Sequence, residues 1–301
     1  MNWPSPLAAL TYLCVLVFFV GIILRAVKYA RAPMHLRWEL YPVPHEKGRA
    51  HGGSYLEESE WWTHPRETDL VAEIGAMLEE MLLIRSLWHR NRPQWYASFP
   101  FHIGLYMLTG FIVLLALGAG LEQPLGSASA AWSFLQGLTV VVGVVGLISA
   151  TVGAVLLLWR RLADPVLRAA SSSSDYFNLI FLLAVFLSAW FAWMTVDPTF
   201  GLLRGYLRGF LTLSPAATGY KAIAWEVAVA SLFMIYLPFT HMTHFVAKYF
   251  TYHQVRWDDV PNLGDANTQA KMMANLSRPV GWSAPHIQSD KSWAEAATEV
   301  K

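Results

Sequence analysis

The chain has 301 residues, of which 55% are hydrophobic and only 14% are charged. Soluble domains carry roughly 25% charged residues, so the composition excludes an ordinary soluble enzyme and equally a disordered or fibrous chain. The formal net charge of +1 argues against nucleic acid as a partner. Cys14 is the single cysteine, so the chain cannot build an internal disulfide, an iron–sulfur cluster or a Cys-x-x-Cys-His haem attachment. The ten histidines are therefore the candidate ligands for a soft metal or a haem.

Five apolar runs are long enough to cross a bilayer, which takes about 20 predominantly apolar residues. They cover residues 7–27, 99–119, 132–159, 176–196 and 223–250. The first run has no basic start and is too long for the core of a signal peptide, so we expect it to be retained as a helix. The sequence thus predicts an all-α integral membrane bundle of five transmembrane helices.

Lysine and arginine are distributed unequally between the two sides of the predicted bundle. Alternating the spans puts 18 of them on the side of residues 28–98, 160–175 and the tail from Lys248, and three on the other side. The positive-inside rule places the richer side in the cytoplasm. We therefore expect a multi-pass protein of the bacterial inner (cytoplasmic) membrane, with its N-terminus outside and its C-terminus in the cytoplasm.

The segments outside the bilayer also carry patterns. Within the long cytoplasmic loop 28–98, apolar residues at helical spacing predict an amphipathic helix that lies on the membrane or on a partner. Its apolar positions are Leu70, Val71, Ile74, Met77, Leu78, Met81 and Leu82. The outer segment 200–213 has an interfacial composition as well. We expect residues 1–257 to form the membrane domain, and 258–301 a polar cytoplasmic tail without clear periodicity.

Three histidines fall inside the predicted spans, where a titratable side chain is costly and indicates function. His102 lies about one helical turn inside the cytoplasmic end of the second membrane helix. His244 lies about one turn inside the cytoplasmic end of the fifth, and His241 about one turn deeper. Two antiparallel helices would therefore present imidazoles at matching depth in the cytoplasmic half of the bilayer.

A pair of imidazoles at one depth can clamp a planar cofactor, and haem b takes two neutral histidines as axial ligands. Pro238 removes a backbone hydrogen bond just before His241 and can bend the fifth helix to make room. Arg92 and Lys248, at the cytoplasmic flanks, are candidate partners for the haem propionates. Two alternatives stay open. His102 could be an interhelical hydrogen-bonding residue, and the His-x-x-His pair could hold zinc or a di-iron centre, although the sequence has no second histidine box.

Other titratable residues give weaker signals. Glu226, near the outer edge of the fifth helix, is expected to be an interfacial carboxylate that reaches water, with proton handling as the alternative. His89 and His253 are expected at the surface near the cytoplasmic boundary, where they could support a second site.

Short motifs over roughly residues 1–260 carry a resemblance to a known family. They are Trp-Glu-Leu-Tyr-Pro-Val-Pro-His-Glu at 38–46, Gly-Gly-Ser-Tyr-Leu-Glu at 52–57, Trp-Trp at 61–62, Asn-Arg-Pro-Gln-Trp-Tyr at 91–96, Phe-His-Ile-Gly-Leu-Tyr at 101–106, and the segment from His244-Phe245 to Tyr252-His253. With them, the five-helix pattern resembles the gamma subunit of respiratory nitrate reductase. Within that superfamily it resembles the membrane cytochrome b subunits of the Tmc and Dsr complexes of sulfate- and metal-reducing bacteria.

The resemblance implies a quinone-reactive cytochrome b that exchanges electrons with a cytoplasmic-side iron–sulfur subunit, often of the heterodisulfide-reductase-like CCG type. It also implies two haems stacked across the bilayer, each held by one histidine of the second helix and one of the fifth. This sequence has candidates for the inner pair, His102 with His244 or His241, but no histidine between 103 and 119 or between 223 and 240. We therefore expect the usual outer haem to be absent. A second haem would have to recruit His89, His253 or another peripheral histidine, or come from another subunit.

The sequence thus predicts the electron-transferring membrane subunit of an oxidoreductase complex, with at least one haem b and with menaquinone or another quinone as substrate. Because the chain has one cysteine, any iron–sulfur cluster must belong to a partner, and a flavoprotein partner is equally compatible. The alternative is a membrane anchor that has lost its cofactors and only tethers a partner, which the missing outer histidines favour. A transporter would need an internal repeat and interrupted helices at mid-membrane, and the sequence indicates neither.

Overall fold

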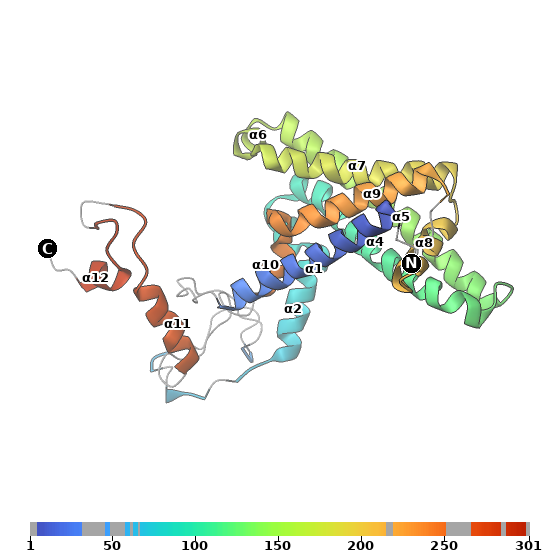
Figure 1. Ribbon diagram of the computed structural model, residues 1–301. Coiled ribbons are helices and arrows are strands. Elements are labelled where there is room, and N and C mark those ends of the chain that lie inside the picture. Colours follow the sequence, from blue (N-terminus) through green and yellow to red (C-terminus); the bar gives the residue numbers. More distant parts are fainter. Residues whose placement is uncertain are drawn as a thin grey trace. The chain divides into compact units, whose positions relative to one another are not determined.

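The computed structural model describes residues 5–31, 46–48, 58–60, 63–65, 67–214, 219–250, 266–283 and 287–298. Over these residues the regular secondary structure is helical, with two isolated β-bridges and no strand, so the predicted all-α class is confirmed (Figure 1). The chain divides into two compact units. The first is formed by Met1–Val20 and Glu79–Thr240, and the second by Gly21–Leu78 and His241–Lys301.

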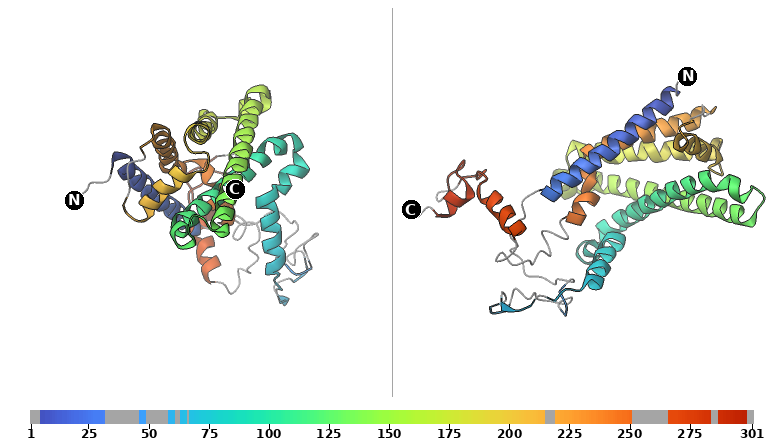
Figure 2. Two further views of the ribbon diagram at one scale, coloured as in Figure 1. Left: turned by 90° about the vertical axis from the view of Figure 1, so that its right-hand side faces the viewer. Right: turned by 60° about the horizontal axis from the view of Figure 1, so that its bottom comes forward.

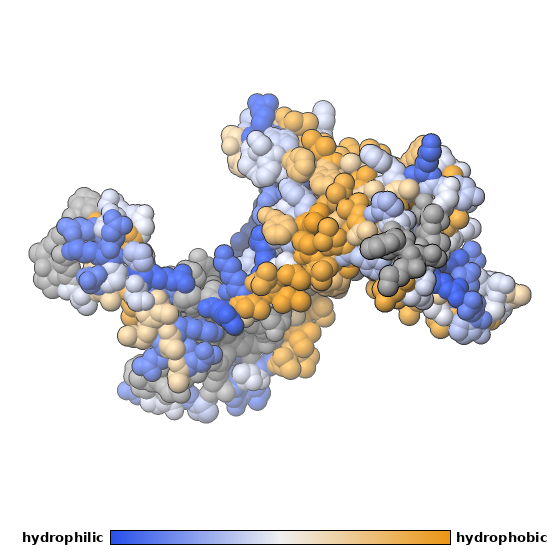
Figure 3. All heavy atoms as spheres, viewed as in Figure 1, coloured by the Kyte–Doolittle hydropathy of each residue, from blue (hydrophilic) through white to orange (hydrophobic). Residues whose placement is uncertain are grey.

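Five helical segments of the described residues have the length and apolar composition of membrane spans, as predicted. They are α1 (Pro6–Arg31), α4 (Arg92–Leu125), α5 (Ala130–Ala163), α7 (Ser173–Thr195), and α9 (Lys221–Tyr236) with the turn that extends it to Phe239. Hydrophobic side chains cover the long side of α1 in the view of Figure 3, as a lipid-facing helix requires. The chain is a multi-pass membrane protein.

The fifth predicted helix, residues 223–250, is not continuous. The α-helix ends at Tyr236, and two 3-10 turns, Leu237–Phe239 and His241–Thr243, precede α10 (His244–Phe250). Pro238 has no amide hydrogen, and its ring clashes with the carbonyl group four residues earlier. Thr240, with an extended ψ of 168°, completes the interruption. The fifth predicted span is thus interrupted beside Pro238, just before His241, which is the place where the sequence predicts a bend.

The helices α4 and α5 form the most extensive helix pair of the first unit and lie side by side in Figure 2. A Cβ atom on Gly153 would lie 2.3 Å from the backbone nitrogen of Phe101, and one on Gly104 would lie 2.2 Å from that of Ala150. The missing side chains thus allow the two backbones to touch, which is how small residues pack membrane helices. The cap of α5 is Ser129, whose Oγ accepts a hydrogen bond from the amide of Trp132 (3.1 Å).

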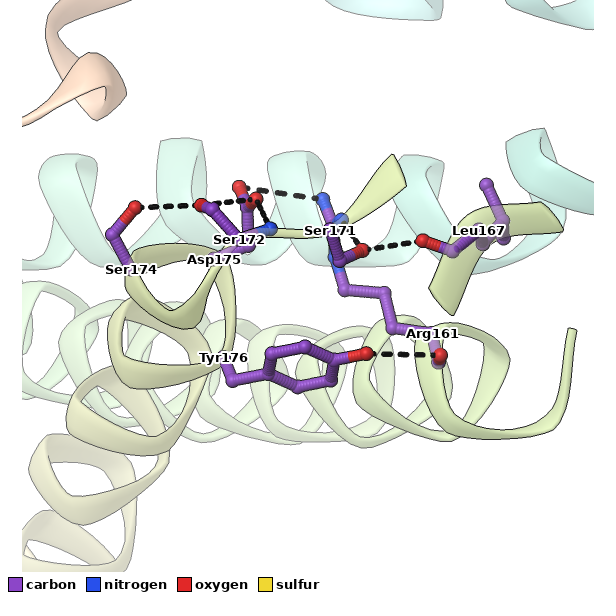
Figure 4. Close-up of polar contacts among 7 residues, drawn as sticks. All are labelled: Arg161, Leu167, Ser171, Ser172, Ser174, Asp175 and Tyr176. Atoms are coloured by element: carbon purple, nitrogen blue, oxygen red, sulfur yellow. Dashed lines mark hydrogen bonds and ion pairs between the residues drawn. The ribbon is translucent and has the colours of Figure 1, made fainter. Parts of the chain in front are cut away.

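The helix α7 packs on both α5 and α9 and so joins the two halves of the bundle. Its first turn is capped because the amide and hydroxyl of Ser172 both donate to Asp175 Oδ2 at 2.8 Å (Figure 4). Arg161 Nη1 donates to Ser171 Oγ (2.6 Å), and the hydroxyl of Tyr176 donates to the Arg161 carbonyl oxygen (3.2 Å) (Figure 4). These bonds hold the path from α5 through α6 (Pro165–Ala170) into α7.

The first unit has two ends, which we call the His102 end and the α8 end. The His102 end contains α3 (Arg85–Arg90), the start of α4 and α6, and Arg160 Nε donates there to Gln94 Oε1 (2.9 Å). The α8 end contains α8 (Gly201–Leu211), the turn between α4 and α5, and the starts of α1 and α9 (Figure 1). A core of buried Ala192, Tyr206, Ile223 and Val227, with Leu7 packed against it, binds these elements together.

Two further predictions concern segments outside the spans. The helix predicted at 70–82 is present as α2 (Leu70–Leu83). Its apolar residues Leu70, Val71 and Leu78 are exposed. Contact of this helix with a membrane or a partner stays a prediction. The C-terminal tail, in which the sequence has no clear periodicity, contains α11 (Ala266–Leu276) and α12 (Trp293–Thr298).

Candidate functional site

His102 is held by its own helix in an orientation suited to a ligand. Its Nδ1 lies 2.7 Å from the carbonyl oxygen of Ser98, one turn earlier, and 3.2 Å from the Ser98 hydroxyl. A carbonyl oxygen can only accept a hydrogen bond, so in the neutral imidazole this contact requires the proton on Nδ1. The lone pair then resides on Nε2, which is the arrangement of a histidine that ligates a metal.

His102 lies on a different side of α4 from Phe101 and Gly104, which contact α5. That contact uses Phe101 and Gly104, both buried, whereas His102 is half-buried and follows Phe101 by about 100° around the helix. The Phe101 ring stands edge-on to the imidazole, with ring centres 5.4 Å apart. The side of α4 that presents His102 is therefore distinct from the side that packs on α5.

His241 and His244 lie in the second unit, at the start of a 3-10 turn and at the first residue of α10. The chain is not α-helical between Tyr236 and His244, so the two histidines are not one turn apart on a continuous α-helix, as the sequence predicts. The pairing of His102 with His244 or His241 stays a prediction.

The other predicted site residues are scattered. His89 is exposed on α3, and Lys248 lies on α10. Arg92 begins α4 and places its guanidinium carbon 4.6 Å from the centre of the Trp88 ring. His253 lies outside the described residues. Among the residues that are described, no three His, Cys, Asp or Glu side chains come together as a metal site.

Aromatic side chains gather at the His102 end. Trp95 stacks on Phe99 with centres 4.4 Å apart, and the Trp88 ring meets it edge-on at 4.7 Å. The indole nitrogen of Trp95 donates to the Leu83 carbonyl oxygen, and the hydroxyl of Tyr106 donates to the Met81 carbonyl oxygen, both at 2.7 Å. These bonds tie the end of α2 to α4, close in sequence to His102.

The α8 end contains polar residues whose positions the sequence analysis missed. Both carboxylate oxygens of Asp197 accept hydrogen bonds from the first turn of α8, from Leu202 N (3.1 Å) and Leu203 N (2.9 Å). An aspartate shortly before a helix often caps its first turn, so Asp197 could have been recognised in the sequence as a sign that a helix begins after it. Arg204, one of the three basic residues that the sequence analysis counts on the outer side, is 6% exposed and lies over the Trp132 ring at 4.7 Å. Its burial has no local sequence signal.

The fold defines a multi-pass helical membrane protein. His102, oriented by the Ser98 carbonyl oxygen, is a candidate metal or haem ligand in its second span. The family model of the nitrate reductase gamma subunit matches residues 86–259, which is more than half of the chain, so the protein belongs to the nitrate reductase gamma subunit family. A comparison with curated proteins gives no match. Members of the family are membrane cytochrome b subunits of respiratory complexes, which bind haem b and interact with quinone and catalytic subunits. The predicted family is thus confirmed, whereas the resemblance to the Tmc and Dsr subunits stays a prediction.

Proposed function

We propose that this chain is a cytochrome b subunit that binds a single haem b and transfers electrons between a quinone, menaquinone or another, and an iron–sulfur or flavoprotein subunit on the cytoplasmic side. In this proposal the haem is held by His102 and by His244 or His241, with Arg92 and Lys248 near its propionates. When bound, the haem supplies one-electron redox chemistry at a potential set by its ligands and their hydrogen bonds.

The observation that carries the proposal is the bond from His102 Nδ1 to the Ser98 carbonyl oxygen. This bond fixes the ring against rotation and keeps Nε2 basic, as the outer contacts of metal-bound histidines do. The site residues present therefore fit an axial ligand of haem b.

A single haem is supported by the packing of the α8 end. The described spans α4 and α9 contain no histidine there. Instead, the Phe200 ring packs on Phe111 with centres 4.6 Å apart, in the space that Gly143 leaves open. Arg204 occupies the space beside Gly118, where a Cβ atom would come within 2.9 Å of its side chain. The side chains of Arg204 on α8 and of Phe200 just before it thus fill the region beside α4 at this end.

The asymmetry of lysine and arginine supports the orientation in the proposal, with residues 28–98 and the tail in the cytoplasm of a bacterial inner membrane. The cytoplasmic partner would dock on these segments, among them the exposed apolar side of α2. Since the chain has one cysteine, the clusters or flavin that continue the electron path belong to that partner.

The test is haem quantitation on the full-length protein purified from membranes with its partner subunits. We expect a reduced-minus-oxidised haem b spectrum and one haem per chain by the pyridine haemochrome assay. His102→Ala should lose the spectrum, and of His244→Ala and His241→Ala, one should lose it and the other retain it. His89→Ala is the matched control, because His89 is exposed on α3, and it should retain the haem.

If His102→Ala fails to accumulate in the membrane, His102→Met separates folding from ligation, because methionine is itself an axial ligand and should shift the spectrum. Two haems per chain would contradict the single-haem proposal. If the intact protein, purified with its partner subunits, gives no haem b signal, the cytochrome function is rejected. The chain would then be a redox-inactive anchor for its partner.

A further inference from the structure

Some polar side chains are buried inside the membrane spans of the first unit. Glu226 of α9 is 9% exposed, so the prediction that it reaches water is wrong. Asn178, in the second turn of α7, is 3% exposed. A buried amide group in a span is costly unless a partner satisfies it, and such a residue indicates function. The partner of Asn178 lies on another helix.

Tyr236, the last residue of α9, is that partner. Its hydroxyl donates a hydrogen bond to Asn178 Oδ1 (2.8 Å). The centre of its ring lies 5.4 Å from that of Phe177, which it meets edge-on, and 5.6 Å from that of Phe181. All three neighbours belong to the first half of α7, which holds Tyr236 both by its hydroxyl and by its ring. The end of α9 therefore has one position along α7 and one rotation about its own axis.

The hydrogen bond between Asn178 and Tyr236 contributes more to the arrangement of α7 and α9 than to their stability. The two helices also pack through apolar rings, among them Phe181 and Phe233, which are perpendicular with centres 5.3 Å apart. Hydrogen bonds between membrane helices add little stability, because the unfolded chain in the membrane finds other partners for the same groups. A buried polar pair instead selects one arrangement from several that apolar packing alone would allow.

The position of Tyr236 matters because the α-helix ends there and the chain continues to His241. Pro238 is fully buried, and its ring fixes its own φ angle. The Leu237 carbonyl oxygen accepts hydrogen bonds from both the amide (3.2 Å) and the hydroxyl (2.9 Å) of Thr240. The chain from Tyr236 to Thr240 is therefore a closed turn with little freedom, and His241 follows it directly.

We propose that Asn178 is a positioning residue for the haem. By holding Tyr236, it fixes the point at which the chain leaves α9, and with it the orientation in which His241 or His244 presents its imidazole. The proposal rests on the proposed function, because it takes one of these histidines as an axial ligand. The groups that orient an axial histidine tune the properties of the iron, as hydrogen bonds to metal ligands generally do.

The test is made on the full-length protein purified from membranes with its partner subunits. Tyr236→Phe removes only the hydroxyl and keeps the ring, and Asn178→Leu removes the acceptor at a similar volume. Both variants should retain the haem. The electron paramagnetic resonance signal of the oxidised haem, which depends on how the axial imidazoles are oriented, should broaden, and the reduction potential should shift. The double variant should show no larger change than either single variant, since both remove the same bond.

Two further variants separate positioning from helix packing. Asn178→Asp keeps an acceptor oxygen for the Tyr236 hydroxyl and should restore the wild-type signal. The matched control is Thr151→Val, which removes another interhelical hydrogen bond of α7, from Trp190 Nε1 to Thr151 Oγ1 (3.1 Å). Trp190 lies about three turns further along α7 than Asn178. The control variant should therefore lose some stability without a change in the haem signal.

The outcomes are distinguishable. If Asn178→Leu does not accumulate in the membrane, Tyr236→Phe still tests the bond, because its ring keeps the contacts with Phe177 and Phe181. An unchanged signal and an unchanged potential in Tyr236→Phe would overturn the proposal and leave the bond a purely structural one. A wild-type protein without haem would reject the proposed function and this proposal with it.

Discussion

The two ends of α4 use small residues for opposite purposes. At the His102 end, Gly104 and Gly153 bring the backbones of α4 and α5 into direct contact. At the α8 end, Gly118 and Gly143 instead leave space that other side chains fill, among them those of Arg204, Phe111 and Phe200. The same helix pair is thus closed by backbone contact at one end and by inserted side chains at the other.

This difference separates two functions along one helix. Direct backbone contact fixes α4 against α5, and the neighbouring side of α4 carries His102, the proposed haem ligand. Inserted side chains give the α8 end a buried polar interior, in which Asp197 and Arg204 are held by α8. Substitutions at the two ends should therefore affect cofactor content and stability separately, and the predictions below test that separation.

The largest effect is expected from Gly153→Ala. The new Cβ atom would lie 2.3 Å from the backbone nitrogen and 2.5 Å from the Cα of Phe101, and a backbone cannot rotate away as a side chain can. The helices must separate beside His102, at a cost of about 3 kcal/mol or more, which is at the upper end of the range for overpacked sites. Thermal unfolding in detergent should show the loss, and the haem content should fall with it.

Gly137→Ala is the matched control for that variant, because it lies on the same helix and its Cβ atom would meet nothing within 4 Å. Alanine is the better helix former by about 1 kcal/mol, so this variant should be unchanged or slightly more stable. Equal effects of the two substitutions would show that α4 and α5 are not in backbone contact at the His102 end.

A smaller effect, confined to the other end, is expected from Phe200→Ala. The Phe200 ring is 4% exposed and packs on Phe111, although the residue itself has a left-handed backbone with φ of 55°. Loss of a buried phenylalanine ring destabilises a protein by about 3 kcal/mol. The midpoint of thermal unfolding should fall while the haem content of the folded protein stays the same, in contrast to Gly153→Ala.

Leu213→Ala controls for the unusual backbone, because Leu213 has nearly the same φ, 56°, but is 79% exposed. Its stability should change by about 0.5 kcal/mol or less, as at other exposed positions. If Phe200→Ala also removed the haem, the two ends of α4 would not be independent.

The spans were predictable because each is a continuous apolar run, and burial in lipid leaves the backbone no alternative to a helix. The interruption after Tyr236 was only partly predictable. Pro238 marks it in the sequence, but whether a proline bends or ends a membrane helix depends on the groups that satisfy the freed carbonyl oxygens. The sequence therefore predicts a disturbed helix before His241, but not that His241 itself begins a 3-10 turn.

Of the candidate site, the sequence predicted the histidine but not the groups around it. His102 stood out because a histidine in an apolar run is rare. Its partner, the Ser98 carbonyl oxygen, could not stand out, since every residue carries one. The positions of Arg204 and Asp197 depend on how α8 folds back onto α4, a long-range contact that no local pattern encodes. Two charged side chains, Asp197 and Arg204, are therefore buried at the α8 end without a local sequence signal for their burial.

The smallest effect is expected from Tyr206→Phe, which tests how the α8 end responds to pH. The variant loses the 2.8 Å contact with Thr11 Oγ1, and Thr11 keeps Leu7 and Ser231 as neighbours, so the cost near neutral pH should be about 1 kcal/mol. Burial raises the pKa of Tyr206 above its ordinary value of 10.0, so the folded protein keeps the phenol neutral where the unfolded chain has already ionised. The unfolded state then binds fewer protons, and the stability that this group contributes falls as the pH rises above about 10. Thermal unfolding at neutral and alkaline pH should show the advantage of the wild type over Tyr206→Phe shrinking as the pH rises. An advantage that stays constant with pH would mean that the hydroxyl is not buried against α1.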